Sequence, residues 1–140
     1  MERTLIGRPI VTGSAEGTAL ISQEPISFWG GVSPQTGEII DRRHELSGAN
    51  VTGKVFVFPT GRGSSTSSAV LMQCIKSGVA PAAIINLNVD PMLALGSIVS
   101  DELYHRSVPI VILNQEDFLS ITQDDLLAVK PDGRVLVNLK

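Results

Sequence analysis

A strand-to-helix connection near the middle of the chain decides the fold, and it reads Lys54-Val55-Phe56-Val57-Phe58-Pro59-Thr60-Gly61-Arg62-Gly63-Ser64-Ser65-Thr66-Ser67-Ser68. The apolar, β-branched and aromatic run over 55–58 predicts a buried strand, which Pro59 ends. The apolar-rich run that follows predicts a helix over 66–76, with Ser77-Gly78 as its C-terminal stop. A strand that leads directly into a helix is the first half of a βαβ unit.

The connection between this strand and helix has the composition of an anion-binding site. The start of a helix presents unpaired N–H groups and the positive end of the helix dipole, and Arg62 adds a planar pair of donors. Gly61 and Gly63 permit a close approach of a ligand to the backbone. The alternative is structural, because serine and threonine cap helices and glycine is common in turns. The spacing matches neither a Walker A loop nor a nucleophile elbow.

The rest of the chain extends this unit in both directions. Strands over 81–86 and 108–113 and a helix over 90–103 complete a central βαβαβ unit, whose strands we expect to be parallel. The N-terminal part predicts strands over 5–12 and 17–22, joined by the turn Gly13–Glu16, and a short strand over 38–41. The C-terminal part predicts a short helix over 115–119 and a hairpin over 127–137 that turns at Pro131-Asp132-Gly133. Ligands of such sheets bind at the carboxyl ends of the strands, where residues 59–66 lie.

Composition limits the class of protein. The 140 residues, 43% hydrophobic and 18% charged, predict one globular domain over 1–140 with a mostly aliphatic core, because aromatics make up only 4%. The net charge of −3 argues against a nucleic-acid partner. The sequence has no apolar run long enough to cross a membrane and no resemblance to a signal peptide at its start, which predicts a cytoplasmic protein with no membrane partner.

Several single residues allow two interpretations each. Cys74, the one cysteine of the sequence, falls in the predicted helix and is expected to be a buried small hydrophobe that binds no metal. The two histidines, His44 and His105, have charged neighbours and are expected on surfaces or loops. Phe28 and Trp29, in the segment Ser27–Gly31, are candidates for the core, for an aromatic wall beside a site or for a contact with another subunit. Asn86, Asn88 and Asp90 between a strand and a helix predict a helix cap, with a ligand site as the alternative.

Six segments together resemble the small, swivelling subunit of the aconitase X family of dehydratases. They are Gly13–Ala19, Pro25–Gly37, Gly53–Ser68, Ala80–Ile85, Leu95–Val99 and Ser107–Val111. The resemblance implies an α/β fold of the swivelling β/β/α type, like the mobile domain of aconitase, with β-rich, barrel-like ends around the central βαβαβ unit. It also implies a hydro-lyase subunit that is inactive without a large subunit, which supplies the cysteines of an iron–sulfur cluster.

The resemblance also assigns roles to residues of the connection. Ser64, directly after Gly61-Arg62-Gly63, is implied as the catalytic base, with Ser65 as its rival. Arg62, Gly63, Ser65 and Thr66 are expected to bind the substrate. A serine hydroxyl becomes a base only where its alkoxide is stabilised, and N–H groups at a helix start together with an arginine do this in a closed site. The cluster iron would activate the leaving hydroxyl from the partner's side.

The substrate has two alternatives in this family, mevalonate 5-phosphate and cis-3-hydroxy-L-proline. The phosphomevalonate enzymes carry lysine and glycine where Arg62 and Ser67 stand, and the segment 101–106 and the tail after Leu113 are closer to the bacterial type. These differences favour cis-3-hydroxy-L-proline or a related hydroxy acid. Two other functions remain open: a stand-alone anion-binding or regulatory module that uses the same loop, and an assembly scaffold in which the loop is only a turn.

Overall fold

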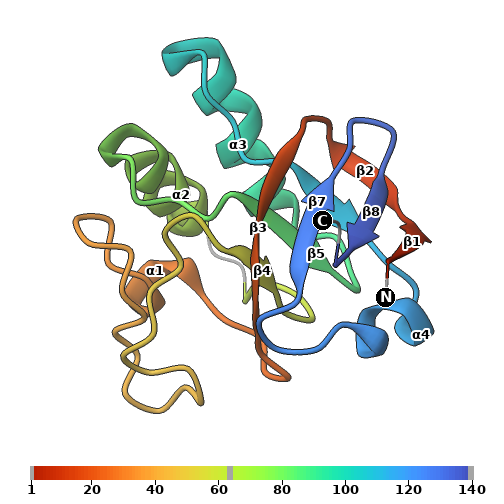
Figure 1. The fold of residues 1–140 in the computed structure, drawn as a ribbon. Helices are drawn as coiled ribbons and strands as arrows, with labels where there is room; N and C mark the ends of the chain where they lie inside the picture. The colour runs from red at the N-terminus through yellow and green to blue at the C-terminus, as the bar shows by residue number, and fades with distance from the viewer. Residues whose placement is uncertain (1, 63–64, 139–140) are drawn as a thin grey trace.

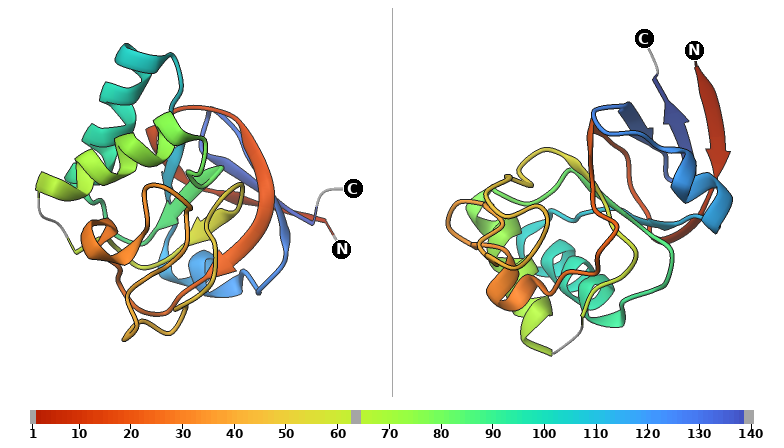
Figure 2. Two further views of the ribbon diagram at one scale, coloured as in Figure 1. Left: turned by 90° about the vertical axis from the view of Figure 1, so that its left-hand side faces the viewer. Right: turned by 90° about the horizontal axis from the view of Figure 1, so that it is seen from below.

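A computed structural model describes residues 2–62 and 65–138 of the chain. The strands are β1 (Arg3–Ile6), β2 (Arg8–Val11), β3 (Ala15–Ile21), β4 (Val55–Val57), β5 (Ala83–Asn86), β6 (Ile110–Ile112), β7 (Leu126–Val129) and β8 (Arg134–Val137). The helices are α1 (Phe28–Gly31), α2 (Ser65–Ser77), α3 (Pro91–Tyr104) and α4 (Gln115–Ser120). Figure 1 shows α2 and α3 beside the sheet, and Figure 2 shows both chain ends on the side away from these two helices.

The strands form one eight-stranded sheet in the order β1-β8-β7-β3-β4-β5-β6-β2. Strands β3, β4, β5 and β6 are parallel neighbours, and the remaining pairs are antiparallel. The two outer strands, β1 and β2, are separated in the chain only by Gly7, whose N–H donates to the carbonyl of Gly133 at 3.0 Å and extends the pairing of β1 with β8. The sheet is therefore a nearly closed barrel with β-rich ends, and the central βαβαβ unit predicted from the sequence is confirmed.

The N-terminal strand prediction was wrong in two details. The expected strand over 5–12 is divided at Gly7, because β1 pairs with β8 while β2 pairs with β6 on the other side of the barrel. Gly7 permits this change of partner, since a Cβ there would collide with Val111 and Gly133. The expected turn Gly13–Glu16 does not make a hairpin, because β3 begins at Ala15 and pairs with β4 and β7. Residues 38–41 form only isolated bridges.

Two clusters of buried side chains hold the sheet and its helices together. One lies between the sheet and helices α2 and α3 and contains Phe28, Phe56 and Phe58, with the rings of Phe56 and Phe58 4.4 Å apart. The other includes side chains of the barrel strands, among them Val55 and Val57, and is joined by Phe118 of α4. Because β4 contributes to both clusters, all three of its residues are buried, as expected for a central parallel strand.

The long segment from residue 22 to residue 53 is irregular apart from the short α1. It lies beside α2 and the carboxyl ends of β3 and β4 (Figure 1). Within α1, Gly30 has a φ of +75°, which a side chain would strain, so the helix is a single distorted turn. None of the helices in the part of the chain that the structure describes is long and apolar enough to cross a membrane. This irregular segment and the loop after β4 together form the candidate functional site.

Candidate functional site

The loop after β4 is tied on one side to the segment that follows β5. The side-chain amide Nδ2 of the fully buried Asn86 donates to the carbonyl of Phe58 at 2.8 Å. The carbonyl of Pro59 accepts from the N–H groups of Leu87 and Asn88, at 2.9 and 3.2 Å. These bonds replace the strand ladder where Pro59 ends it, so the first residues of the loop have a fixed path.

Asp90 lies directly under this loop. Its Oδ1 accepts from the N–H of Met92 at 2.9 Å and caps α3, which confirms the capping prediction for this residue. Its Oδ2 is buried, has no hydrogen-bond partner among the described residues and touches the Cα region of Gly61, where a Cβ would overlap the carboxylate. Gly61 is therefore required by a close contact rather than by an unusual backbone conformation.

On its other side, the loop is tied to the irregular segment through Ile26. The N–H of Ile26 donates to the carbonyl of Thr60 at 3.4 Å, and the N–H of Arg62 donates to the carbonyl of Ile26 at 3.0 Å. Ile26 is itself buried, so this short parallel bridge is anchored in the core. The loop is held between two segments, and Arg62 emerges from it at a defined point.

The predicted site residues have different outcomes in the structure. Arg62, Ser65 and Thr66 lie next to the start of α2 and are exposed. Gly63 and Ser64 lie outside the described residues, so the predicted base is not placed. Helix α2 has no acidic residue in its first turn, so no side chain there opposes the positive end of its dipole. Ser67, by contrast, is buried, with its Oγ 3.5 Å from the Oγ of Ser27.

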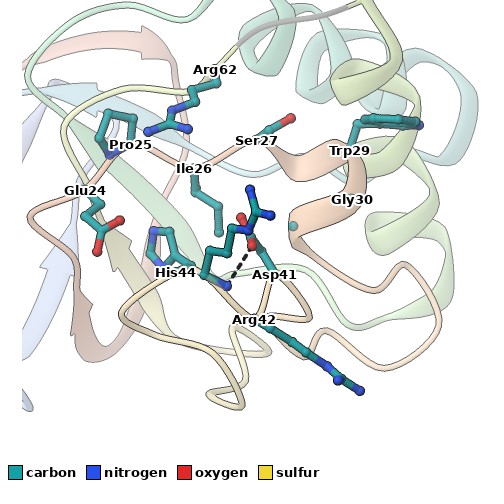
Figure 3. Close-up of a pocket in the computed structure, with 12 residues that line it drawn as sticks. Glu24, Pro25, Ile26, Ser27, Trp29, Gly30, Asp41, Arg42, His44 and Arg62 are labelled. Carbon is teal, nitrogen blue, oxygen red and sulfur yellow. Dashed lines mark hydrogen bonds between the residues drawn. The ribbon is translucent and has the colours of Figure 1, made fainter.

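An open pocket of about 620 Å³ adjoins the loop (Figure 3). Its lining joins Arg62 to two parts of the irregular segment, 24–31 and 41–44. Sequence reasoning did not place Arg42 and Arg43, two charged neighbours of His44, in this pocket. No periodic pattern marks them, and the bridge between Ile26 and Gly61 that brings the two segments together is a tertiary contact.

Three single-residue expectations can be compared with the structure. Cys74 is buried, as expected, and burial raises the pKa of its thiol to about 11, so it stays protonated. Phe28 belongs to the core, whereas Trp29 is 60% exposed, so Trp29 alone of the pair is available for a contact. His105 is exposed, and His44 lies in a loop, as expected, although its side chain is only 6% exposed.

The buried side chain of His44 forms hydrogen bonds that fix the conformation of its loop. Its Nδ1 accepts from the N–H of Leu46 at 3.1 Å, and its Nε2 lies 3.4 Å from the Oγ of Ser22. Since Nδ1 accepts, Nε2 carries the proton and faces the serine. The Ser22 hydroxyl in turn lies 2.7 Å from a carboxylate oxygen of Glu45. This network fixes the loop that carries Arg42 and Arg43.

The chain itself offers no site for a metal or an iron–sulfur cluster in its described part. No group of three or more His, Cys, Asp or Glu side chains within residues 2–62 and 65–138 is arranged to hold a metal ion. The thiol that resembles a cluster ligand most, that of Cys74, is enclosed in the core. The described residues therefore do not fit an iron–sulfur cluster.

A nearly closed, mostly β barrel that carries two helices on one side, with a glycine-serine loop at the carboxyl end of a parallel strand, has the architecture of a swivelling β/β/α domain. The chain belongs to the aconitase X swivel domain family, whose family model matches residues 4–137. Its fold superimposes with a TM-score of 0.87 on the crystal structure of Thermococcus kodakaraensis aconitase X in its holo-form, at 36% sequence identity and with 99% of each chain covered.

Curated relatives carry two different names. The chain is 48% identical over 111 residues to a cis-3-hydroxy-L-proline dehydratase of Pseudomonas aeruginosa, which covers 79% of this chain but only 19% of that protein. It is 44% identical over 126 residues to the phosphomevalonate dehydratase small subunit of Methanosarcina acetivorans, which covers 89% of this chain and 83% of that one. These relatives are dehydratases or dehydratase subunits, consistent with a hydro-lyase subunit. The chain spans about a fifth of the first relative's length and most of the second's.

Proposed function

We propose that this chain is the small, swivelling part of an aconitase X-type hydro-lyase, and that its loop after β4 completes an active site on a large subunit. The large subunit holds the iron–sulfur cluster, and this chain binds none. The observation that supports the proposal is the loop held between Ile26 and Asp90, from which Arg62 emerges three residues before α2, in a chain of this family. Without the large subunit, the chain is expected to be inactive.

In this proposal the chain supplies the base that takes a proton from the substrate, together with the groups that stabilise this base. Arg62 and the N–H groups at the start of α2 stabilise the alkoxide form of Ser64, since both present donors without a competing acidic side chain in the first turn. The alkoxide takes the proton from the substrate carbon and becomes a neutral hydroxyl, while hydroxide leaves the neighbouring carbon, and Ser65 is the alternative base. Gly63 leaves room for the substrate, and Ser65 and Thr66 bind it.

We propose cis-3-hydroxy-L-proline or a related hydroxy acid as the substrate. Arg62 and Ser67, where the resemblance gives lysine and glycine to the phosphomevalonate enzymes, support this choice. Mevalonate 5-phosphate is the second candidate, because the methanogen small subunits are 44–45% identical to this chain over 89% of its length. Both substrates carry a carboxylate, which sits on a ring in cis-3-hydroxy-L-proline, and mevalonate 5-phosphate carries a phosphate ester in addition.

The test is reconstitution of the chain with the cysteine-bearing large subunit of its source organism. Dehydration of each substrate is followed with the chain alone, the large subunit alone and the mixture, and activity is expected only in the mixture. Ser64→Ala is expected to lower kcat by about a hundredfold or more, as loss of a general base does. Ser68→Ala is the matched control, because the Ser68 hydroxyl donates within α2 to the carbonyl of Ser65 at 2.6 Å.

Two results would overturn parts of this assignment. If Ser65→Ala abolishes turnover while Ser64→Ala leaves it unchanged, Ser65 is the base. If the mixture dehydrates neither substrate while the chain alone binds phosphate and gains thermal stability from it, the anion-binding module replaces the hydro-lyase as the function.

A further inference from the structure

The pocket beside the loop collects positive charge from distant parts of the chain. Arg62 comes from the loop after β4, whereas Arg42 and Arg43 come from the irregular segment, and all three line the same open pocket of about 620 Å³. Figure 3 shows that the side chain of Arg42 extends away from Ile26, whereas Arg62 lies above Ile26 and Pro25. Arg42 and Arg62 therefore point in different directions, and Arg42 provides a control residue of the same charge.

No carboxylate among the described residues pairs with a guanidinium group in this pocket. Within residues 2–62 and 65–138, one ion pair forms, between Arg134 and Asp132, and it is not in the pocket. Two acidic residues, Glu24 and Asp41, also line the pocket, but their carboxylates accept backbone N–H groups instead. Asp41 accepts from the N–H of Arg43 at 3.0 Å, and Glu24 accepts from the N–H of Glu45 at 3.3 Å. The arginines keep their paired donors for a ligand.

The backbone that carries Arg43 and Arg62 is rigid. The backbone of Arg62 is bonded to the buried Ile26, as described above. The turn of Arg43 is closed by Asp41, whose carbonyl also accepts from the N–H of His44 at 3.1 Å, and the buried His44 locks it to Ser22. A ligand that binds between the two arginines meets a preformed site and does not have to order the loops that hold them.

The position of the pocket also suits an anion. Its lining follows the ends of β3 and β4, at the edge of a parallel sheet where ligands bind, and one lining residue, Ser27, lies 3.5 Å by its Oγ from the Oγ of Ser67 in the first turn of α2. The exposed Trp29 and Gly30 line it as well, and Gly30 has open space where a side chain would stand. Figure 3 shows the ring of Trp29 at the rim, directed away from Arg62, so the pocket presents cationic donors with the indole at its edge.

We propose that Arg43 and Arg62 together bind one oxyanion of a small molecule, a carboxylate or a phosphate, in this pocket, with Trp29 at its edge. This inference deepens the proposed function, on which it rests for the identity of the ligand: the anion is the acidic group of the hydro-lyase substrate. Arg43, which no motif in the sequence marks, becomes a substrate-binding residue from outside the glycine-serine loop.

The test uses the full chain alone and two simple probes. Inorganic phosphate and acetate are titrated in parallel at constant ionic strength, and the N–H signal of Trp29, the one tryptophan of the sequence, reports binding by NMR. Saturable shifts are expected with at least one probe, which names the preferred group. Arg43→Gln and Arg62→Gln are each expected to raise the Kd about tenfold or more, since each removes a charged pair of donors.

Arg42→Gln removes the same charge from the neighbouring position and is expected to raise the Kd less than about threefold, because that side chain points away. Arg43→Lys keeps the charge but loses the planar fork, and its Kd is expected between those of wild type and Arg43→Gln. The amide spectrum of each variant checks that the fold is intact. Equal weakening by Arg42→Gln and Arg43→Gln, or shifts that never saturate, would overturn the proposal, because both mean general charge screening.

Failure of this inference is distinguishable from failure of the proposed function. If the wild-type mixture with the large subunit shows no dehydration but the chain alone binds the probe through Arg43, anion binding in the pocket is supported and the hydro-lyase assignment is wrong. If the mixture is active and Arg43→Gln leaves both the KM and probe binding unchanged, the assignment of Arg43 to anion binding is wrong and the hydro-lyase function is unaffected.

Discussion

The central βαβαβ unit and the irregular segment 22–53 are held together in opposite ways. In the unit, β4, β5 and β6 are parallel and almost wholly buried, and α2 and α3 cover them through aliphatic and aromatic side chains. In the segment, Ser22, His44 and Glu45 form a polar network, and Asp41 closes a turn with its own side chain. Burial of apolar area gives the unit most of its free energy of folding, whereas hydrogen bonds give the segment its shape.

This difference has a functional consequence, because the candidate site lies where the two regions meet. The loop after β4 belongs to the unit, but Ile26 of the segment bonds to it on one side and Asp90 of the unit lies under it on the other. The unit therefore provides a rigid frame, and the segment provides Arg42, Arg43 and Trp29 around it. Substitutions in the two regions should differ in whether they change global stability or only the pocket.

The largest effect is expected in the unit. Phe56→Ala removes a fully buried ring that stacks near Phe58, and the cavity should lower the free energy of unfolding by about 3–5 kcal/mol. Urea unfolding followed by circular dichroism measures it, with Ile40→Ala as the control, because Ile40 of the segment is about half exposed. If the two substitutions cost the same, the unit is not the stabilising frame of the fold.

A smaller effect is expected at the junction of the two regions. In Gly61→Ala the new methyl group overlaps the buried carboxylate of Asp90, and the displacement should cost about 1–3 kcal/mol in unfolding free energy. Asp90→Ala alone should cost about 1 kcal/mol, as loss of a helix cap does. Asn114→Ala, which removes the cap of α4, is the matched control for that loss.

The double variant tests the contact itself. Because Asp90→Ala makes room for the methyl group, the double variant should be more stable than the sum of the single costs predicts, by about 0.5 kcal/mol or more. Strict additivity in urea unfolding would mean that Gly61 and Asp90 do not touch in solution.

The sequence predicts the two regions with unequal success, for the same physical reason. Apolar runs at 55–58 and 81–86 and the stop at Ser77-Gly78 reflect local preferences, so the elements of the unit fall within one or two residues of their predicted bounds. The division of the first strand at Gly7 depends on Val111 and Gly133, which are more than a hundred residues away in the chain. A local pattern does not contain that information.

The site shows the same limit. The glycine-serine loop has a local signature, and the helix that it predicts begins at Ser65, within one residue of its predicted start. His44 looks like a surface residue from its charged neighbours, yet its side chain is buried. It forms one hydrogen bond with the distant Ser22 and one with the nearby backbone N–H of Leu46. Arg43 and Arg62 line one pocket because Ile26 bonds to the loop after β4, while His44 and Glu45 bond to residues 22–23. Residues that reach the pocket from the irregular segment were therefore not predictable one by one.

The smallest effect concerns the polar network of the segment and depends on pH. Hydrogen bonds from the Ser22 hydroxyl and the N–H of Gln23 lower the pKa of Glu45 in the folded protein. A lowered folded pKa means that the folded state binds fewer protons than the unfolded state, so this stabilisation is present above the unfolded value of about 4.3 and is lost as the pH falls through the folded pKa. Glu45→Gln should therefore be less stable than wild type at neutral pH and should converge with it in acid.

The size of this effect is limited by exposure, because Glu45 faces solvent and its interactions are screened, so the difference at neutral pH should stay below about 1 kcal/mol. Thermal unfolding at a series of pH values measures it. Glu38→Gln, an exposed glutamate of the same segment with the same loss of charge, is the control and should show no such convergence. Parallel curves for Glu45→Gln and wild type down to acid pH would show that the carboxylate does not hold this loop, and hydrogen bonds to the uncharged amide would then suffice for the segment.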